Sequence, residues 1–143
     1  QLAVRIQKAL EVADACQDVY EFRAPYYEKF LNSVNAFSPL ETVPAALACL
    51  YIGQGAPRSA IIGAVNLGRD CDSSACIAGE IAGALQGIDA IPGDWITQVN
   101  VANPEPNLAQ VARQVTQTLH GMRDEEKARV DALTAMMGES SPD

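Results

Sequence analysis

Apolar residues recur at intervals of three and four along most of this chain, and this spacing restricts its fold more than any other feature. At the start of the chain the series consists of Leu2, Ile6, Leu10, Ala13, Cys16 and Tyr20. It predicts one long amphipathic helix over residues 2–20, because positions three or four apart share a helix face. Alternating strand-like runs are scarce, and alanine, the best helix former, is abundant. We therefore predict an all-α fold, a compact multi-helix bundle.

Proline and glycine predict where the other helices begin and end. Pro25 is expected to open a short aromatic-rich helix, and residues 32–39 to form a loop. A helix over 40–52 follows, in which Pro44 fits only the first turn. Further helices are predicted over 57–67, 73–86, 94–99, 108–120 and 124–137. His120 is interpreted as a charge-favoured cap at the end of its helix, without a functional role.

Length, composition and charge limit the class of protein. The chain has 143 residues, 48% hydrophobic and 20% charged, which fits one folded all-α unit over residues 1–143 with a tail at 138–143. The net charge of −8, without a basic stripe, argues against a nucleic-acid partner. No apolar run is long enough to cross a bilayer, and no signal peptide is present, so we expect no membrane partner. The four cysteines lack the spacing of a disulfide framework and are expected to be thiols in the cytoplasm.

An acidic segment, residues 68–74, is the strongest candidate for chemistry. Asp70 and Asp72 lie two positions apart, and the hydroxyl of Ser73 follows at once. Residues at i and i+2 do not face each other on a helix. In a tight loop, however, they can converge on one hard cation, which prefers oxygen ligands. The alternative interpretation is an ordinary acidic loop that caps the next helix, and the spacing alone leaves both open.

The helix predicted after this loop carries a stripe of small residues. Its members are Ala75, Ala78, Gly79, Ala82 and Gly83. A glycine inside a helix costs about 1 kcal/mol against alanine, so we expect close packing to offset this cost. The stripe therefore predicts a neighbouring helix whose backbone approaches closely.

An ordered series of motifs around the acidic loop identifies a known family. The run over residues 64–95 contains an Asn, a Gly-x-Asp-x-Asp-Ser loop, a Gly-Ala-x-x-Gly helix end, an Ile-Pro pair and a Trp. These features are Asn66, Gly68–Ser73, Gly83-Ala84 with Gly87, Ile91-Pro92 and Trp95. The upstream segment 41–46, Glu-Thr-Val-Pro-Ala-Ala, fits the same pattern. Together they resemble the ADP-ribosylglycohydrolase superfamily, of the dinitrogenase-reductase-activating type.

The resemblance implies a fold, a cofactor and a reaction. The fold is the C-terminal portion of the all-helical ADP-ribosylglycohydrolase fold, and the cofactor is a pair of Mg²⁺ ions, with Mn²⁺ as an alternative. The family's metal ligands correspond to Asp70, Asp72 and Ser73, where serine replaces the usual threonine. The reaction is hydrolysis of a glycosidic bond at the ribose of ADP-ribose, on a modified protein or a small ribosyl substrate. Substrate-binding candidates are Gly68, Arg69, Phe37 and Ser38.

The chain lacks the family's N-terminal metal-binding segments. Members carry a Gly-Asp segment and a hydroxyl-Asp-Asp loop there, whereas the only Gly-Asp pair here, Gly93-Asp94, follows the acidic loop. We therefore expect a half site, completed by an N-terminal half that is a separate chain or a missing segment, and the catalytic acid-base residue is unknown. Two alternatives stay open: a non-catalytic helical binding or structural subunit that retains the loop, and a glycohydrolase of a small nucleoside-like substrate. For Arg69, an ordinary salt bridge is an alternative to a substrate contact.

Overall fold

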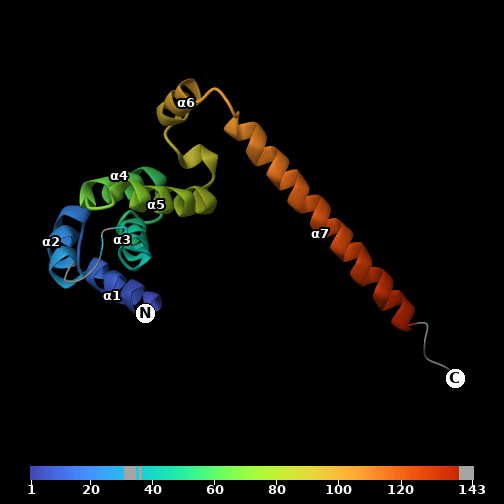
Figure 1. Cartoon of the computed structure of the whole chain (residues 1–143), viewed down its shortest axis with the longest axis horizontal. Coiled ribbons are helices and arrows are strands. Elements are labelled where there is room, and N and C mark those ends of the chain that lie inside the picture. Colours follow the sequence, from blue (N-terminus) through green and yellow to red (C-terminus); the bar gives the residue numbers. More distant parts are fainter. Residues whose placement is uncertain (31–34, 36, 139–143) are drawn as a thin grey trace. The chain divides into compact units, whose positions relative to one another are not determined.

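The computed structural model describes residues 1–30, 35 and 37–138, and this part of the chain is entirely helical apart from its turns and loops (Figure 1). Its elements are α1 (Leu2–Asp14), α2 (Val19–Phe30), α3 (Pro39–Ile52), α4 (Pro57–Leu67), α5 (Cys71–Gln86), the short 3-10 helix η1 (Ile88–Ala90), α6 (Gly93–Ala102) and α7 (Leu108–Gly138). The predicted all-α class is confirmed. Among the described helices, none is long and apolar enough to cross a membrane.

The chain divides into two compact units, residues 1–96 and 97–143. The first contains α1 to α5 and η1, and the second contains the whole of α7. Our prediction of one all-α unit over residues 1–143 stays a prediction. The predicted tail at 138–143 falls outside the described residues, except for Gly138, which ends α7.

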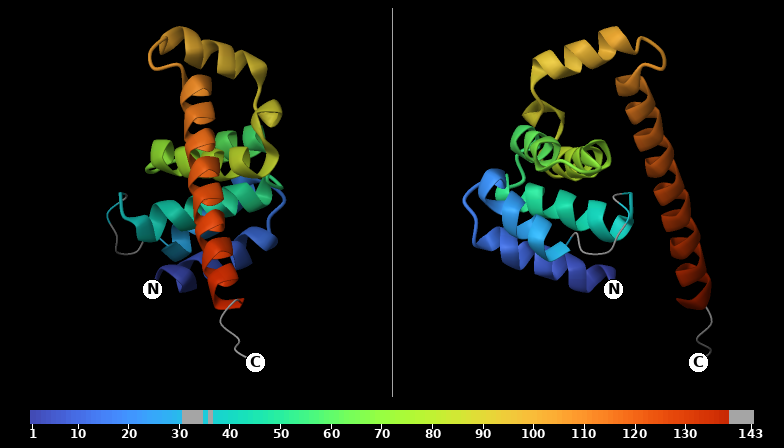
Figure 2. Two further views of the ribbon diagram at one scale, coloured as in Figure 1. Left: turned by 90° about the vertical axis from the view of Figure 1, so that its right-hand side faces the viewer. Right: turned by 60° about the vertical axis from the view of Figure 1, so that its left-hand side comes forward.

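Small residues let the helices of the first unit pack closely. α4 lies beside α5, and α1 beside α3 (Figures 1 and 2). Ala78 and Ala82 of α5 are fully buried, as are Ala60 and Ala64 of α4. A Cβ atom added at Gly79 would lie 3.1 Å from the side chain of Ile61. The close approach that the small-residue stripe predicts is confirmed.

The N-terminal helix is shorter than its apolar rhythm predicts. It ends at Asp14, and α2 begins at Val19, because Asp18 and Glu21 form the start of a new helix. The Asp18 carboxylate accepts hydrogen bonds from the backbone N–H groups of Tyr20 and Glu21, and the Glu21 carboxylate accepts one from the N–H of Gln17. Such reciprocal capping satisfies N–H groups that have no partner in the first turn.

Two prolines lie inside helices, contrary to our prediction. Pro25 does not open a helix but stands within α2, and Pro44 lies beyond the first turn of α3. A proline has no N–H, so Pro44 leaves the carbonyl of Leu40, four residues earlier, without its helical donor. The Arg5 guanidinium takes that place, donating from Nε to the Leu40 oxygen at 2.7 Å and from Nη2 to the Phe30 oxygen at 3.0 Å. A contact from α1 therefore replaces the missing hydrogen bond.

Other boundaries also differ from our predictions, and α6 extends over Gly93–Ala102 rather than 94–99. α3 begins at Pro39, after the cap Ser38, and residues 32–34 and 36 of the predicted loop lie outside the described residues. α5 begins at Cys71 rather than residue 73, since the aspartate before it already occupies the cap position. The two helices predicted over 108–120 and 124–137 are one helix, α7, so His120 caps no helix end. A lone glycine after it costs too little to break a helix.

Candidate functional site

The acidic loop makes a tight left-handed turn between α4 and α5. Gly68 has a φ of +88° and Arg69 a φ of +63°, which is uncommon for a residue with a side chain. A Cβ atom at Gly68 would lie 2.8 Å from the Tyr27 hydroxyl oxygen, so both the backbone and the space require glycine there. The Tyr27 hydroxyl donates to the carbonyl oxygen of Leu67 at 2.8 Å. The turn is thereby held against α2.

The predicted metal ligands all lie at the beginning of α5. Asp70 is buried at its cap position, with 8% of its surface exposed; Asp72 is exposed in the first turn, and Ser73 is half-buried. An aspartate at a cap usually accepts a hydrogen bond from the first turn, but the Asp70 side chain makes no such bond. Two carboxylates and a hydroxyl are hard oxygen donors and fit Mg²⁺ or Mn²⁺. Within the described residues, no group of three or more His, Cys, Asp or Glu side chains is placed to hold a metal ion.

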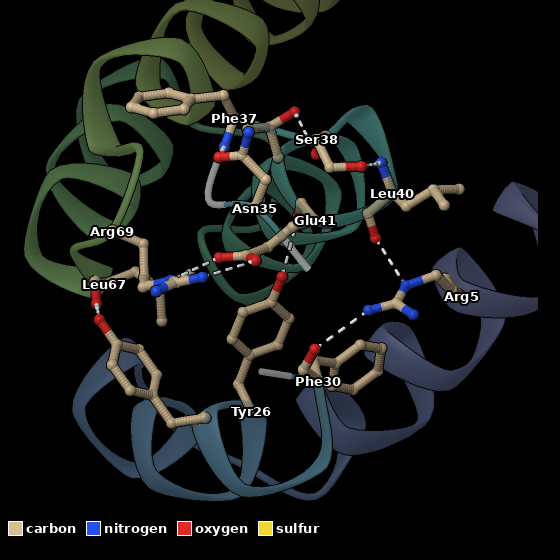
Figure 3. A network of polar contacts seen from close by, with 12 residues as sticks. Arg5, Tyr26, Phe30, Asn35, Phe37, Ser38, Leu40, Glu41, Leu67 and Arg69 are labelled. Carbon is tan, nitrogen blue, oxygen red and sulfur yellow. Dashed lines mark hydrogen bonds and ion pairs between the residues drawn. The ribbon is translucent and has the colours of Figure 1, made fainter. Parts of the chain in front are cut away.

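An ion pair between the exposed Arg69 and the buried Glu41 joins the acidic loop to α3. Arg69 donates from Nε to one carboxylate oxygen of Glu41 at 2.7 Å and from Nη2 to the other at 3.0 Å (Figure 3). Glu41 is only 2% exposed, and the Tyr26 hydroxyl donates to its backbone oxygen at 2.9 Å. Arg69 thus forms a salt bridge, as the alternative interpretation predicts, although the carboxylate of its partner is removed from water. Whether Arg69 also contacts substrate stays a prediction.

Charge and burial around this pair shift two pKa values upward. The hydrogen bonds to Glu41 raise the pKa of Arg69, so its guanidinium is charged throughout the physiological range. Burial, and then the nearby charge of Glu41, raises the pKa of Tyr26, which therefore stays a neutral hydrogen-bond donor. Near neutral pH, Arg69 is therefore charged and Tyr26 is neutral.

The remaining substrate-binding candidates stand before α3. The Phe37 ring is 74% exposed, and Ser38 caps the helix, its hydroxyl oxygen accepting from the N–H of Leu40 at 3.3 Å. Both residues directly precede α3, the helix that contains Glu41 (Figure 3). Their predicted contact with substrate stays a prediction.

Sequence reasoning assigns no role to the residues that hold the loop in place. In the sequence, Glu41 stands out only as part of the family pattern, and Tyr26 and Tyr27 stand out only as aromatic residues of a helix. Their contacts join positions 15 to 40 residues apart. One signal is available in the sequence. Glu41 lies in the first turn of the otherwise largely apolar helix α3. A glutamate buried there needs a cation to pair with it, which points to a nearby arginine or lysine.

Comparison with known proteins adds to this geometry. The family model described as ADP-ribosylglycohydrolase matches residues 1–128, a stretch that contains the whole acidic loop and Glu41. The chain belongs to the ADP-ribosylglycohydrolase family. The predicted family is therefore confirmed, and the all-helical structure fits it.

Three curated relatives illustrate this family. The chain is 26% identical to an ADP-ribosyl-[dinitrogen reductase] glycohydrolase of Rhodospirillum rubrum over 84% of its own length and 34% of the relative's. It is 37% identical to the ADP-ribosylarginine hydrolase Tri1 of Pseudomonas putida over 50% and 19%, and 36% identical to the ADP-ribosylhydrolase ARH3 of Danio rerio over 53% and 23%. The chain thus spans about a third or less of the length of these relatives. No solved structure matches it at a significant level.

Proposed function

We propose that the protein catalyses magnesium-dependent hydrolysis of the bond between ADP-ribose and its acceptor. The observation that carries this proposal is the donor set at the start of α5, in a chain of the ADP-ribosylglycohydrolase family. Asp70, Asp72 and Ser73 are all present, and the Asp70 carboxylate is not used to cap the helix. Because it makes no cap hydrogen bond, the Asp70 carboxylate is a candidate ligand for a cation.

The loop would hold one side of a two-ion centre. Asp70 and Asp72 supply negative charge and Ser73 a neutral oxygen, which are fewer ligands than two divalent ions require. We propose that an N-terminal half of the enzyme, as a separate chain or a further segment, supplies the other ligands and the acid-base residue. When bound, the ions act as Lewis acid and template for the ribose hydroxyls and a water molecule. Mn²⁺ is expected to replace Mg²⁺ in the same oxygen ligands.

The substrate that we propose is an ADP-ribosylated protein. Two relatives carry names that specify such acceptors, dinitrogen reductase and ADP-ribosylarginine. The exposed ring of Phe37 offers a surface for the adenine base, and Gly68, Arg69 and Ser38 are the further candidates for substrate contact. All four cysteines are free thiols, which fits our proposed cytoplasmic location.

The metal site is tested by removing one ligand. In the protein at its full natural length, Mg²⁺ or Mn²⁺ should raise the melting temperature, and Asp72→Ala should abolish both that rise and the release of ADP-ribose from a modified protein. The matched control is Asp94→Ala, because Asp94 is also an exposed aspartate in the first turn of a helix, α6. It should keep the metal response and the activity.

Other outcomes separate the alternatives. A metal response that requires Asp72, without release of ADP-ribose from protein but with hydrolysis of a small nucleoside-like glycoside, would change the substrate and keep the chemistry. No metal response in the natural protein would overturn the proposal and favour a binding or structural subunit that retains the loop.

A further inference from the structure

Glu41 occupies a position where a helix would normally use its carboxylate. Ser38 caps α3 and Glu41 follows three residues later, which is the spacing of a capping box. In that motif the glutamate accepts a hydrogen bond from the backbone N–H of the cap residue. Here both carboxylate oxygens instead accept hydrogen bonds from Arg69, at 2.7 and 3.0 Å. The Glu41 side chain therefore binds the acidic loop and does not cap its own helix.

The cost of this arrangement indicates a specific role. The buried Glu41 carboxylate loses its hydration, whereas 32% of the Arg69 side chain stays exposed. A buried carboxylate of this kind rarely adds stability over a well-packed apolar residue. Arg69 also adopts a left-handed φ of +63°, which glycine would adopt more readily. What arginine supplies at this position is a planar guanidinium that binds a carboxylate through two parallel hydrogen bonds. Such a pair fixes direction as well as distance.

The position of Arg69 makes that direction matter for the metal ligands. It immediately precedes Asp70, so a rotation of the Arg69 backbone would displace the Asp70 carboxylate and the first turn of α5 with it. Two contacts hold the acidic loop. The Tyr27 hydroxyl donates to the Leu67 oxygen before the turn. Within the turn, Arg69 binds Glu41 (Figure 3). The Tyr26 hydroxyl donates to the backbone oxygen of Glu41 rather than to its carboxylate.

We propose that Glu41 is a positioning residue, which acts through its bidentate pair with Arg69 to preorganise Asp70 and Asp72 for the cation. This inference rests on the proposed function, because it assumes that the loop binds a metal ion. Groups that orient metal ligands typically change metal affinity by about 10–100-fold when they are removed. We expect a loss of that size, although neither Glu41 nor Arg69 is a ligand.

The test is a Mn²⁺ titration followed by electron paramagnetic resonance, on the protein at its full natural length. Arg69→Lys keeps the positive charge but cannot form two parallel hydrogen bonds, and Glu41→Gln keeps the shape but loses the charge. Both should weaken Mn²⁺ binding by about 10–100-fold. If Glu41→Gln does not fold, Arg69→Lys carries the test alone, because Arg69 lies at the surface, with a third of its side chain exposed.

Tyr26→Phe is the control for stability. It removes a hydrogen bond to the same residue, Glu41, but leaves the carboxylate and Arg69 unchanged. It should lower the melting temperature and leave the dissociation constant for Mn²⁺ within about twofold of the natural value. An equal loss of Mn²⁺ affinity in Tyr26→Phe and Arg69→Lys would mean general loosening of the fold and would overturn the positioning role.

Failure of this inference differs from failure of the proposed function. If the natural protein binds Mn²⁺ and Asp72→Ala does not, the proposal that the acidic loop binds a metal ion is supported. Unchanged binding in Arg69→Lys and Glu41→Gln would then refute the positioning role alone. If the natural protein and Asp72→Ala bind Mn²⁺ equally, the proposal that the acidic loop binds a metal ion is refuted, and the positioning role of Glu41 is refuted with it.

Discussion

The two units of this chain are both helical, yet they differ in how their apolar residues are used. Among the described residues, every buried hydrophobic side chain, from Ala9 to Ala82, belongs to residues 1–96. In the described part of α7, by contrast, apolar side chains are exposed, from 40% at Val111 to 79% at Met137. Both regions show apolar residues at intervals of three and four. Periodicity therefore predicts a helix but does not determine whether that helix is buried.

What distinguishes the first unit is the size of its core residues. Alanine and glycine predominate where α4 meets α5, so their backbones approach closely. The large buried side chains include Phe22 and Tyr26 of α2. The described side chains of α7 form no buried core, and its strong helix formers account for its regularity. Substitutions that change side-chain volume should thus act differently in the two units.

The largest expected effect comes from enlarging a buried alanine. Ala78→Leu adds three carbon atoms to a fully buried position of α5 and should destabilise the first unit by about 1–3 kcal/mol. For a unit of this size, each kcal/mol lowers the melting temperature by about 4–8 °C. The matched change Ala128→Leu, in exposed α7, should alter stability by less than about 0.5 kcal/mol. Equal losses in thermal unfolding would contradict the contrast between the units.

Replacing glycine with alanine should destabilise the first unit and stabilise the helix of the second. In Gly53→Ala the new Cβ atom would lie 2.9 Å from the backbone nitrogen of Ala60 and 3.1 Å from the Cys49 oxygen, so the backbone must shift. We expect a loss of about 1–2 kcal/mol. At Gly121, inside α7, nothing lies within 4 Å, and alanine should stabilise the helix by about 0.5–1 kcal/mol. Circular dichroism during urea unfolding measures both, and a gain in stability at position 53 would refute the close approach of Gly53 to Ala60.

The parts of the fold that follow local rules could be predicted from the sequence. Gly53, Gly68 and Gly87 end helices, and Pro57 begins one, because each effect depends on a single residue's backbone. The break between α1 and α2 also had a local signal, the Asp18 and Glu21 caps, which the continuous apolar rhythm obscured. Local chemistry thus accounts for most helix boundaries.

The contacts that shape the candidate site could not be predicted in this way. Arg5 restores a hydrogen bond for a carbonyl 35 residues away, and Arg69 finds Glu41 across 28 residues. Such partners are chosen by the packing of helices in three dimensions, which the spacing of residues along the chain does not specify. The sequence predicts Asp70, Asp72 and Ser73 as candidate metal ligands, but it does not predict what holds the acidic loop in place.

A smaller effect is expected from one buried hydroxyl. Tyr26→Phe removes the hydrogen bond to the Glu41 oxygen and should cost about 1 kcal/mol, since Tyr26 is almost wholly buried. Tyr20→Phe is the matched control, because Tyr20 lies on the same helix and is 66% exposed. Its stability should stay within about 0.5 kcal/mol of the natural protein. If urea unfolding gives the same stability for Tyr26→Phe and Tyr20→Phe, the Tyr26 hydroxyl adds nothing to the stability of the fold.

The smallest effect concerns the thiol of Cys49 in the core of the first unit. Burial raises its pKa from an ordinary value of 9.0 to about 12. Its contribution to stability is complete below pH 9 and is lost as the pH rises toward 12, because the unfolded chain releases the proton first. Between pH 7 and pH 9.5, the free energy of unfolding should fall by less than about 1 kcal/mol more in the natural protein than in Cys49→Ala.

Near neutral pH, iodoacetamide should modify the exposed Cys76 and leave the buried Cys49 intact. Equal modification of both thiols in the folded protein would show that solvent reaches Cys49.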